Sequence, residues 1–174
     1  MAKASATSAL DELQVSLQRL GRLLASRQVS ARITSVAGVE VSQQGVALLR
    51  ALRRGGQQPV AALAASAAMD LGAVSRQVRL LEEAGAVERS RSSEDGRVAL
   101  LDLTAEGRRM VDRIQAVSVQ HLEEALQGWS DDEELTLARL MQRLVDDMVR
   151  TPVRPVDADD AGGAEGAEEG AAPG

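Results

Sequence analysis

The sequence predicts a mainly helical fold with one small β-hairpin, an α+β architecture, and three observations support this prediction. Apolar residues recur at intervals of three and four along most of the chain, which is the spacing of amphipathic helices. Hydrophobic residues make up 44% of the chain but aromatic residues only 1%, so the core is aliphatic and rich in alanine, a strong helix former. A polar turn over residues 92–97 separates two short β-like runs, as in a hairpin.

The first long helix is predicted from Leu10 to about Val36, with Gly38 as its stop. Residues 1–8 are small and polar, and we expect them to be disordered. Leucines at alternating three- and four-residue steps form an apolar stripe on this helix, which favours a partner helix. The leucines assigned to dimerisation are Leu10, Leu13, Leu17 and Leu20. The alternative is ordinary packing within one subunit.

The next helix is predicted over residues 43–53, with Ser42 as its N-cap and Gly55-Gly56 as its end. Its inward stripe consists of Val46, Leu49 and Leu52. Three arginines lie in its second half: Arg50, Arg53 and Arg54. We interpret them as a solvated helix end that complements the helix dipole, with phosphate contact as the alternative.

Two helices follow, over residues 59–69 and between Asp70 and Gly85. Pro59 suits a first helical position, because its missing N–H is not needed there. Asp70 can cap the second helix, and Gly85 can take the left-handed conformation that ends it. The apolar stripe of the second helix consists of Leu71, Val74, Val78 and Leu81.

The other face of this second helix combines small, hydroxylated and cationic residues. The residues assigned to DNA binding there are Gly72, Ala73, Ser75, Arg76, Gln77 and Arg79. Small residues let the backbone approach the major groove closely, while Ser, Gln and Arg can reach phosphates and base edges. The alternative is a solvated amphipathic helix.

A hairpin is predicted next, with strands over residues 86–91 and 98–103. Helix, short turn, helix and hairpin is the order of a winged helix-turn-helix, and the hairpin is its wing. The wing residues assigned to DNA binding are Arg91, Ser93, Asp95 and Arg97. We expect Asp95 to brace Arg97 towards the minor groove, with a plain turn ion pair as the alternative.

Two long helices are predicted after the wing. Thr104 can cap the first, which runs to about Gln127, while Ser130 and Glu133 form a capping box for the second. The apolar positions assigned to dimerisation are Ile114, Val117, Leu140 and Leu144. We interpret His121 as a structural residue of the same face, with a role in effector binding or pH sensing as the alternative.

These elements predict one domain over residues 9–150. Its dimerisation helices are assigned to residues 9–37 and 105–149, and the winged helix-turn-helix to residues 42–104. Residues 151–174 form an acidic Gly/Ala run without hydrophobic periodicity, for which we expect a disordered tail.

Several short motifs follow one another in this part of the chain. They are Leu63-Ala64, Ala73-Val74-Ser75-Arg76, Leu81-Glu82-Glu83-Ala84-Gly85, Arg91 through Asp95-x-Arg97, and Leu103-Thr104-x-x-Gly107. Their order and spacing resemble the DNA-binding core of MarR-type transcriptional regulators, and a weaker resemblance extends over residues 8–150. The resemblance implies a homodimer that binds a near-palindromic operator, most often as a repressor. It also implies release by a small-molecule effector bound between the dimer helices and the winged module.

The sequence departs from the family pattern at three places. Ala68 stands where the turn between the two helices usually has Gly. Ala86 stands after Gly85 where Leu is usual. Gly45-Val46 lies where an aromatic residue is common, and the chain has no Phe or Tyr that could stack on an aromatic effector.

The charge distribution separates the predicted DNA-binding module from the rest of the chain. The whole chain has a net charge of −6. Residues 42–109 contain 10 Arg and 8 acidic residues, whereas residues 110–150 contain 4 Arg and 9 acidic residues. Residues 151–174 contain Arg154 and 6 acidic residues. The predicted module is therefore the basic part of an acidic protein.

Composition excludes several classes of function. There is no cysteine and a single histidine, so we expect no disulfide, no thiol switch, no metal site and no cofactor. No titratable pair lies in a recognisable catalytic motif, so we do not expect an enzyme. Charges interrupt residues 1–30 and no apolar run approaches about 20 residues, so we expect a soluble, cytoplasmic protein without membrane contact.

The sequence favours a transcriptional regulator whose partners are double-stranded DNA, a second copy of the chain and a small-molecule effector. One alternative is a DNA-binding dimer of the same fold without an effector. Another is a winged-helix module that binds protein instead of DNA. DNA binding with a sequence preference would separate the last alternative from the other two.

Overall fold

A computed structural model describes residues 2–91 and 99–155, with side chains from residue 8 onward. Their elements in chain order are α1 (Ala2–Leu24), α2 (Arg27–Val36), α3 (Gln43–Gly55), β1 (Gln58–Pro59), α4 (Val60–Ser66), α5 (Leu71–Glu83), β2 (Val87–Arg91), β3 (Ala99–Leu103), α6 (Ala105–Ala125) and α7 (Asp131–Arg150). The chain divides into two units, residues 1–125 and 126–174.

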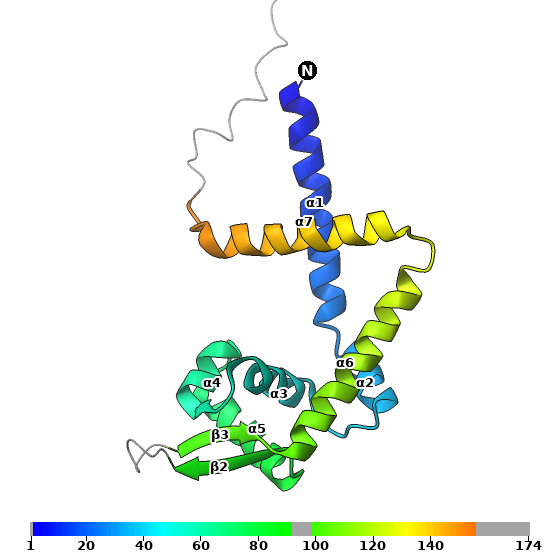
Figure 1. Ribbon diagram of the computed structural model, residues 1–174. Coiled ribbons are helices and arrows are strands. Elements are labelled where there is room, and N and C mark those ends of the chain that lie inside the picture. Colours follow the sequence, from blue (N-terminus) through cyan, green and yellow to red (C-terminus); the bar gives the residue numbers. More distant parts are fainter. Residues whose placement is uncertain (1, 92–98, 156–174) are drawn as a thin grey trace, which may run out of the picture. The chain divides into compact units, whose positions relative to one another are not determined.

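The first unit contains the predicted winged helix-turn-helix. Figure 1 shows α3, α4 and α5 grouped beside the β2–β3 hairpin, with α6 leading away from the end of β3. The strands form an antiparallel sheet in the order β1-β3-β2, and β2 pairs with β3 in a register that sets Val87 opposite Leu103. The mainly helical α+β prediction is therefore confirmed.

An aliphatic core holds this module together, as the absence of Phe and Tyr from the sequence requires. Its members come from α3, α4, α5, the sheet and the first half of α6. Fully buried leucines and valines in it are Leu48, Leu49, Leu52, Leu63, Val74, Val78, Leu81, Leu101 and Leu103. Complete burial of one such side chain contributes about 1.5–3 kcal/mol, so the module can form a stable core without aromatic residues.

The helix boundaries that depend on local capping chemistry lie where the sequence predicts them. The Ser42 hydroxyl accepts a hydrogen bond from the Gly45 N–H at 3.0 Å, and the Asp70 carboxylate accepts one from the Ala73 N–H at 2.8 Å. Gly85 takes φ +67°, and the Ala86 N–H behind it donates to the Leu81 carbonyl at 2.8 Å. Both ends of α5 are thus fixed by the residues around them.

The predicted single helix over residues 10–36 is wrong in two respects. It begins earlier, because residues 2–8, for which the sequence predicts disorder, belong to α1, and it is divided into α1 and α2. Ser26 has an extended backbone, and its hydroxyl accepts from the Val29 N–H at 3.4 Å, so it acts as an N-cap and starts a new helix. The leucine stripe ends at Leu24, and Val29, Ile33 and Val36 resume a helical spacing beyond the break, so the apolar pattern does not reveal it.

Pro59 also differs from its prediction. It is the N-cap residue of α4 and pairs with Leu100 as the second residue of the short strand β1. The prediction missed this strand because two residues are too few to show a strand period. In the turn after α4, Ala68 has φ +51°, the left-handed conformation that favours glycine. Its position is one of those at which the sequence departs from the family pattern.

A second core cluster joins α6 to the other helices of the first unit. Ile114 is 1% exposed and packs with Ala37, Val39 and Val46, while Val117 lies at the edge of this cluster. The assignment of Ile114 to a dimer interface is therefore corrected: this side chain belongs to the core of its own chain. Sequence periodicity shows that a position is apolar but not which surface covers it.

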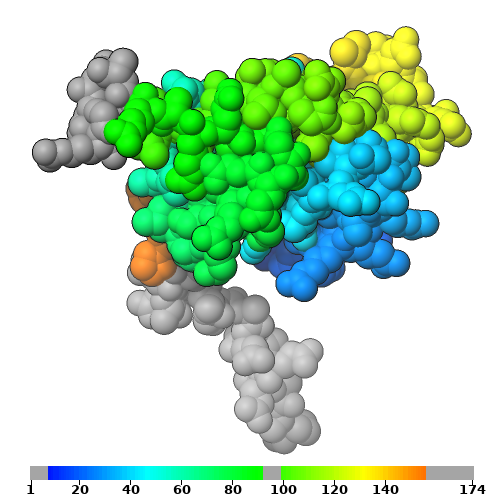
Figure 2. All heavy atoms as spheres, turned by 90° about the horizontal axis from the view of Figure 1, so that it is seen from below, coloured from blue at the N-terminus to red at the C-terminus, as the bar shows by residue number. Residues whose placement is uncertain are grey.

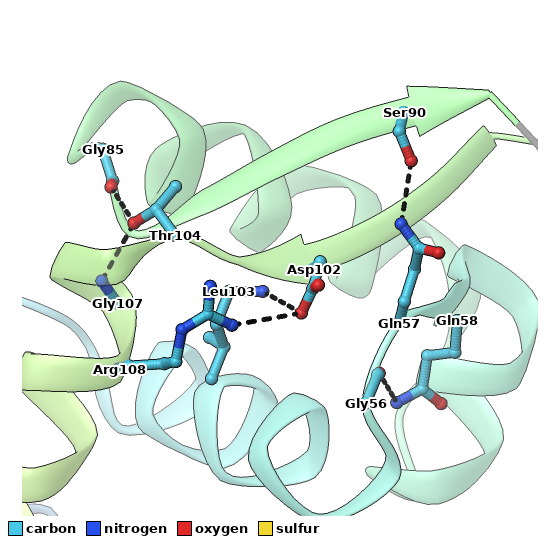
Figure 3. A network of polar contacts seen from close by, with 10 residues as sticks. All are labelled: Gly56, Gln57, Gln58, Gly85, Ser90, Asp102, Leu103, Thr104, Gly107 and Arg108. Atoms are coloured by element: carbon cyan, nitrogen blue, oxygen red, sulfur yellow. Dashed lines mark hydrogen bonds and ion pairs between the residues drawn. The ribbon is translucent and has the colours of Figure 1, made fainter.

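The start of α6 is locked onto the end of α5 and the start of β2. The Thr104 hydroxyl donates to the Gly85 carbonyl at 2.6 Å and accepts from the Gly107 N–H at 3.0 Å, which confirms Thr104 as a cap (Figure 3). The Thr104 N–H donates to the Ala86 carbonyl at 3.1 Å. A Cβ on Gly107 would clash with that same carbonyl oxygen, so the backbones approach more closely than any side chain would allow.

The second unit contains α7. Ser130 and Glu133 form the predicted capping box, and hydrogen bonds from the Ser130 backbone N–H and hydroxyl lower the pKa of Glu133. The helix is followed by Pro152 and carries no buried residue. In the ranges that the structure describes, no helix is both long enough and apolar enough to cross a membrane.

Gly107 provides a test of the packing between α6 and the strand. Replacement of Gly107 by Ala should lower the free energy of unfolding by about 1–3 kcal/mol, because the new methyl group overlaps the Ala86 carbonyl. Chemical denaturation measures this change.

Gly21→Ala is the matched control. Gly21 lies within α1, and a Cβ placed on it would have nothing within 4 Å, so this change should stabilise the chain slightly through helix propensity. Equal stability of the Gly107→Ala variant and the parent would show that the close approach is not present in solution.

Candidate nucleic-acid interface

The exposed face of α5 is the centre of the candidate interface. Its exposed residues include Gly72, Ser75, Arg76 and Arg79, which share one side of the helix because each residue adds about 100° of rotation. The opposite side is buried in the core through Val74, Val78 and Leu81. Green atoms from the part of the chain that contains α5, the hairpin and the start of α6 fill the middle of one face in Figure 2.

Two residues of α5 lie on the opposite face of the helix from the one that the sequence predicts. Ala73 is 8% exposed and belongs to the buried side, whereas Leu71, predicted in the apolar stripe, is 54% exposed. The short helix α4 packs against α5, and the two contribute the small buried residues Ala64 and Ala73. The position of α4 therefore decides which residues of the first turn of α5 are covered.

The two arginines of the exposed face are available for a ligand. Among the described residues, no carboxylate lies within ion-pair distance of Arg76 or Arg79. A Cβ on Gly72 would lie 3.7 Å from an Nη atom of Arg76, so this guanidinium lies over the first turn of the helix. The Ser75 hydroxyl donates to the Leu71 carbonyl at 2.8 Å, which leaves its oxygen facing solvent as an acceptor.

The base of the wing is fixed to α5. Arg89 of β2 donates from Nε to Glu82 Oε1 at 2.6 Å, which joins the strand to the last turn of the helix. The next residue of β2, Ser90, accepts a hydrogen bond from the Gln57 amide at 2.9 Å through its hydroxyl (Figure 3). Arg91, at the end of β2, is exposed. The strands therefore leave the module in a direction set by α5 and by the segment after α3.

Ser93, Asp95 and Arg97 lie outside the described residues, so their assignment to DNA binding stays a prediction.

Ion pairs occupy many of the other arginines near this module. Arg53 lies 3.0 Å from Asp112, and Arg108 lies 3.7 Å from Asp102. Glu106 binds two arginines of α6, and the hydrogen bonds from Arg109 and Arg113 hold its pKa below the usual value. Such exposed pairs contribute little to stability, typically less than about 1 kcal/mol, but they distinguish these arginines from the two on the exposed face of α5.

A cavity of about 410 Å³ lies between α2 and α6 in the first unit. Four aliphatic side chains and four polar ones surround it: Val29, Ile33, Val36, Val117, Arg32, Gln120, His121 and Glu124. The sequence suggested a structural role for His121, and the structure places this side chain at the cavity. In the described part of the chain, no group of three or more His, Asp or Glu residues could hold a metal ion.

Comparisons with known proteins agree on one family. The model of the MarR family matches residues 41–99. The chain is 33% identical over 97 residues to YxaD, an uncharacterised helix-turn-helix transcriptional regulator of Bacillus subtilis, with 56% of this chain and 68% of that protein covered. It is 31% identical over 134 residues to a putative regulatory protein for the hcr operon of Thauera aromatica, with 77% and 80% covered.

A solved structure has the same fold. The structure of a MarR family protein from Bacillus stearothermophilus superposes with a TM-score of 0.74 at 20% identity, and the match covers 83% of this chain and 98% of that one. The structural match supports the fold, and the sequence matches support the family.

Proposed function

Because this chain belongs to the MarR family of transcriptional regulators, we propose that it binds a near-palindromic operator as a homodimer and represses transcription there. The observation that carries this proposal is the exposed face of α5. A capped helix presents a glycine, a serine and two arginines on one side, and its other side is fixed in the core. A helix of this kind can enter the major groove with little loss of side-chain packing.

Five of the six assigned residues of α5 have the following roles in this proposal. Gly72 allows the close approach of the backbone, while Ser75, Arg76 and Arg79 contact phosphates and base edges. Ala73 is buried and supports the helix without contacting DNA. In the wing, Arg91, Ser93 and Arg97 bind the flanking minor groove or its phosphates, and Asp95 braces Arg97.

The apolar stripe of α1 supports a homodimer. Leu10 is 66% exposed, Leu13 and Leu20 are also exposed, and Leu17 is half-buried. On α7, Leu140 is exposed and Leu144 is half-buried, at a spacing that places them on one side of the helix. A second copy of the chain would remove these side chains from water, and its α5 would meet the next major groove of the same operator.

The cavity between α2 and α6 supports control by a small molecule. Its aliphatic lining suits an apolar ligand body, while Arg32, His121 and Glu124 can bind a polar group. The ligand would change the position of α6, which is locked onto the end of α5 through Thr104 and Gly107. Release from the operator would follow from that change.

The roles of Arg76 and Arg97 can be tested together. Replacement of either arginine by Ala should weaken operator binding by roughly 1–3 kcal/mol and leave the melting temperature nearly unchanged. Arg76→Ala should also relax the base preference of each half-site, whereas Arg97→Ala should mainly lower affinity and reduce any preference for A·T-rich flanks.

Mobility-shift titrations at physiological salt, on duplexes selected by the parent chain from a randomised library, measure both effects. Arg139→Ala on α7 is the control, since that exposed arginine is not part of the proposed interface. If both variants bind like the parent, the proposed interface is wrong.

The proposed dimer predicts that a negative charge placed in its apolar stripes prevents dimerisation. Replacement of Leu17 and Leu144 by Glu should give monomer or aggregate and abolish operator binding, because each change places a carboxylate in an apolar contact. Gln18→Glu with Gln142→Glu adds the same charge away from the stripes and should leave a dimer. Light scattering after gel filtration measures the mass, and a soluble Leu17→Glu, Leu144→Glu dimer with normal DNA binding would refute the arrangement.

The effector site predicts a difference between two glutamines of α6. Gln120 lines the cavity and Gln115 does not, although both are exposed. Small aliphatic and aromatic acids are titrated into the operator complex, and any compound that releases the parent chain should act more weakly on Gln120→Trp but normally on Gln115→Trp. Unchanged release of the Gln120→Trp variant would place the effector elsewhere.

A further inference from the structure

Gln77 lies at the border between the two faces of α5, directly after Arg76. Its side chain is not free, because Oε1 accepts a hydrogen bond of 2.7 Å from the Ser42 hydroxyl, and the residue is only partly exposed. Ser42 is the N-cap residue of α3 and lies 35 residues earlier in the chain. A residue assigned from sequence to DNA binding is thus held by a side chain of its own protein.

The Ser42 hydroxyl makes both of its interactions at once. It accepts from the Gly45 N–H at 3.0 Å, and its own proton goes to Gln77. The cap of α3 therefore fixes the direction of the hydroxyl, and the hydroxyl in turn fixes the Gln77 amide. Because the Ser42 hydroxyl is already oriented, the hydrogen bond forms with little further loss of side-chain entropy.

A second contact lies one helical turn farther along α5. Gly45 is buried, and a Cβ placed on it would lie 3.4 Å from Cδ2 of Leu81, four residues after Gln77. The first turn of α3 thus meets successive turns of α5, once through a hydrogen bond and once through close apolar packing. These two contacts add to the core packing of Val74, Val78 and Leu81, and the hydrogen bond lies away from the helix axis, so it resists rotation of α5. Gly45-Val46 lies where the family pattern commonly has an aromatic residue, and a large side chain at Gly45 would push α5 away.

We propose that Gln77 is a positioning residue, and that its hydrogen bond with Ser42 sets the rotation at which α5 presents Arg76 and Arg79. Rotation of α5 would move both guanidinium groups sideways in a groove in which bidentate contacts tolerate little displacement. Ser42 therefore influences operator affinity from another helix. The inference rests on the proposed DNA-binding function and replaces the direct DNA contact that the sequence predicts for Gln77.

A double-mutant cycle tests the proposal on the full chain, with the duplex most enriched by the parent from a randomised library as the probe. Ser42→Ala and Gln77→Ala should each weaken binding by roughly three- to tenfold, the loss expected for one hydrogen bond. The double variant should bind no more than about twofold more weakly than either single variant, because both changes remove the same interaction. The base preference of the half-site should keep its order in all three variants.

Two controls separate positioning from the loss of a helix cap. Ser26→Ala removes the side-chain cap of α2, and the Ser26 hydroxyl bonds to the Val29 N–H rather than to α5. This variant should therefore have a lower melting temperature but the operator affinity of the parent. Ser42→Thr keeps the hydroxyl and the cap, so it should bind within about twofold of the parent. If Ser42→Ala does not fold, Ser42→Thr and Gln77→Ala still give the comparison.

Several results would overturn the proposal. Losses that multiply in the double variant, or a base preference that changes at one position in Gln77→Ala alone, would show that Gln77 contacts a base directly. Normal binding by Ser42→Ala would show that the hydrogen bond does not control the helix.

Hydrogen exchange of the α5 amides in the free protein separates this proposal from the proposed function. Exchange should be faster in Ser42→Ala and Gln77→Ala, by similar factors, and unchanged in Ser26→Ala. If the parent enriches no duplex, the proposed function fails while exchange still tests the contact. If the parent binds DNA and exchange does not change, the positioning role fails alone.

Discussion

The first unit depends on the close contact between the Ala86 carbonyl and the backbone of Gly107. This contact lies where α5 ends, β2 begins and α6 starts, and it is closed by the Thr104 hydroxyl between the Gly85 carbonyl and the Gly107 N–H. Because Gly107 has no side chain, α6 can approach the junction of α5 and β2 closely enough for this contact to form. The start of α6 is therefore fixed to the end of α5, the helix that presents Arg76 and Arg79. A movement of α6 would thus also move α5 and its exposed face.

Helix α3 links the other parts of the unit. Its first turn holds α5 through Ser42 and Gly45, and the Gln43 amide donates to the Ala25 carbonyl at the break between α1 and α2, at 3.3 Å. Farther along, Arg50 donates to the Ser118 hydroxyl of α6 at 3.3 Å. Ser118 follows Val117, which lines the cavity between α2 and α6. A ligand in that cavity would thus lie next to contacts that reach α5 by two routes, through α3 and through the start of α6.

The sequence predicted those features of the fold and the site that depend on neighbouring residues. Asp70, Ser42 and Ser130 cap helices through groups three residues away, and Gly85 ends a helix through its own backbone conformation, so each signal is local. Arg76 and Arg79 follow from the helical period in the same way. The features that the sequence did not predict need distant partners. The inner position of Ala73 depends on α4, the burial of Ile114 depends on the segment around Val39, and the role of Gln77 depends on Ser42. The break at Ser26 is the exception: its cap is local, but the apolar residues Val29, Ile33 and Val36 beyond it resume a helical spacing and conceal it.

In the proposed complex, two copies of α5 enter successive major grooves of one DNA site. Hydroxyl-radical footprinting of the parent chain on its selected duplex tests this arrangement. We predict two protected half-sites related by symmetry, with centres about 10 base pairs apart, since one turn of the double helix separates successive major grooves on one side. Protection without a preferred site, or of a single half-site at saturating protein, would contradict it.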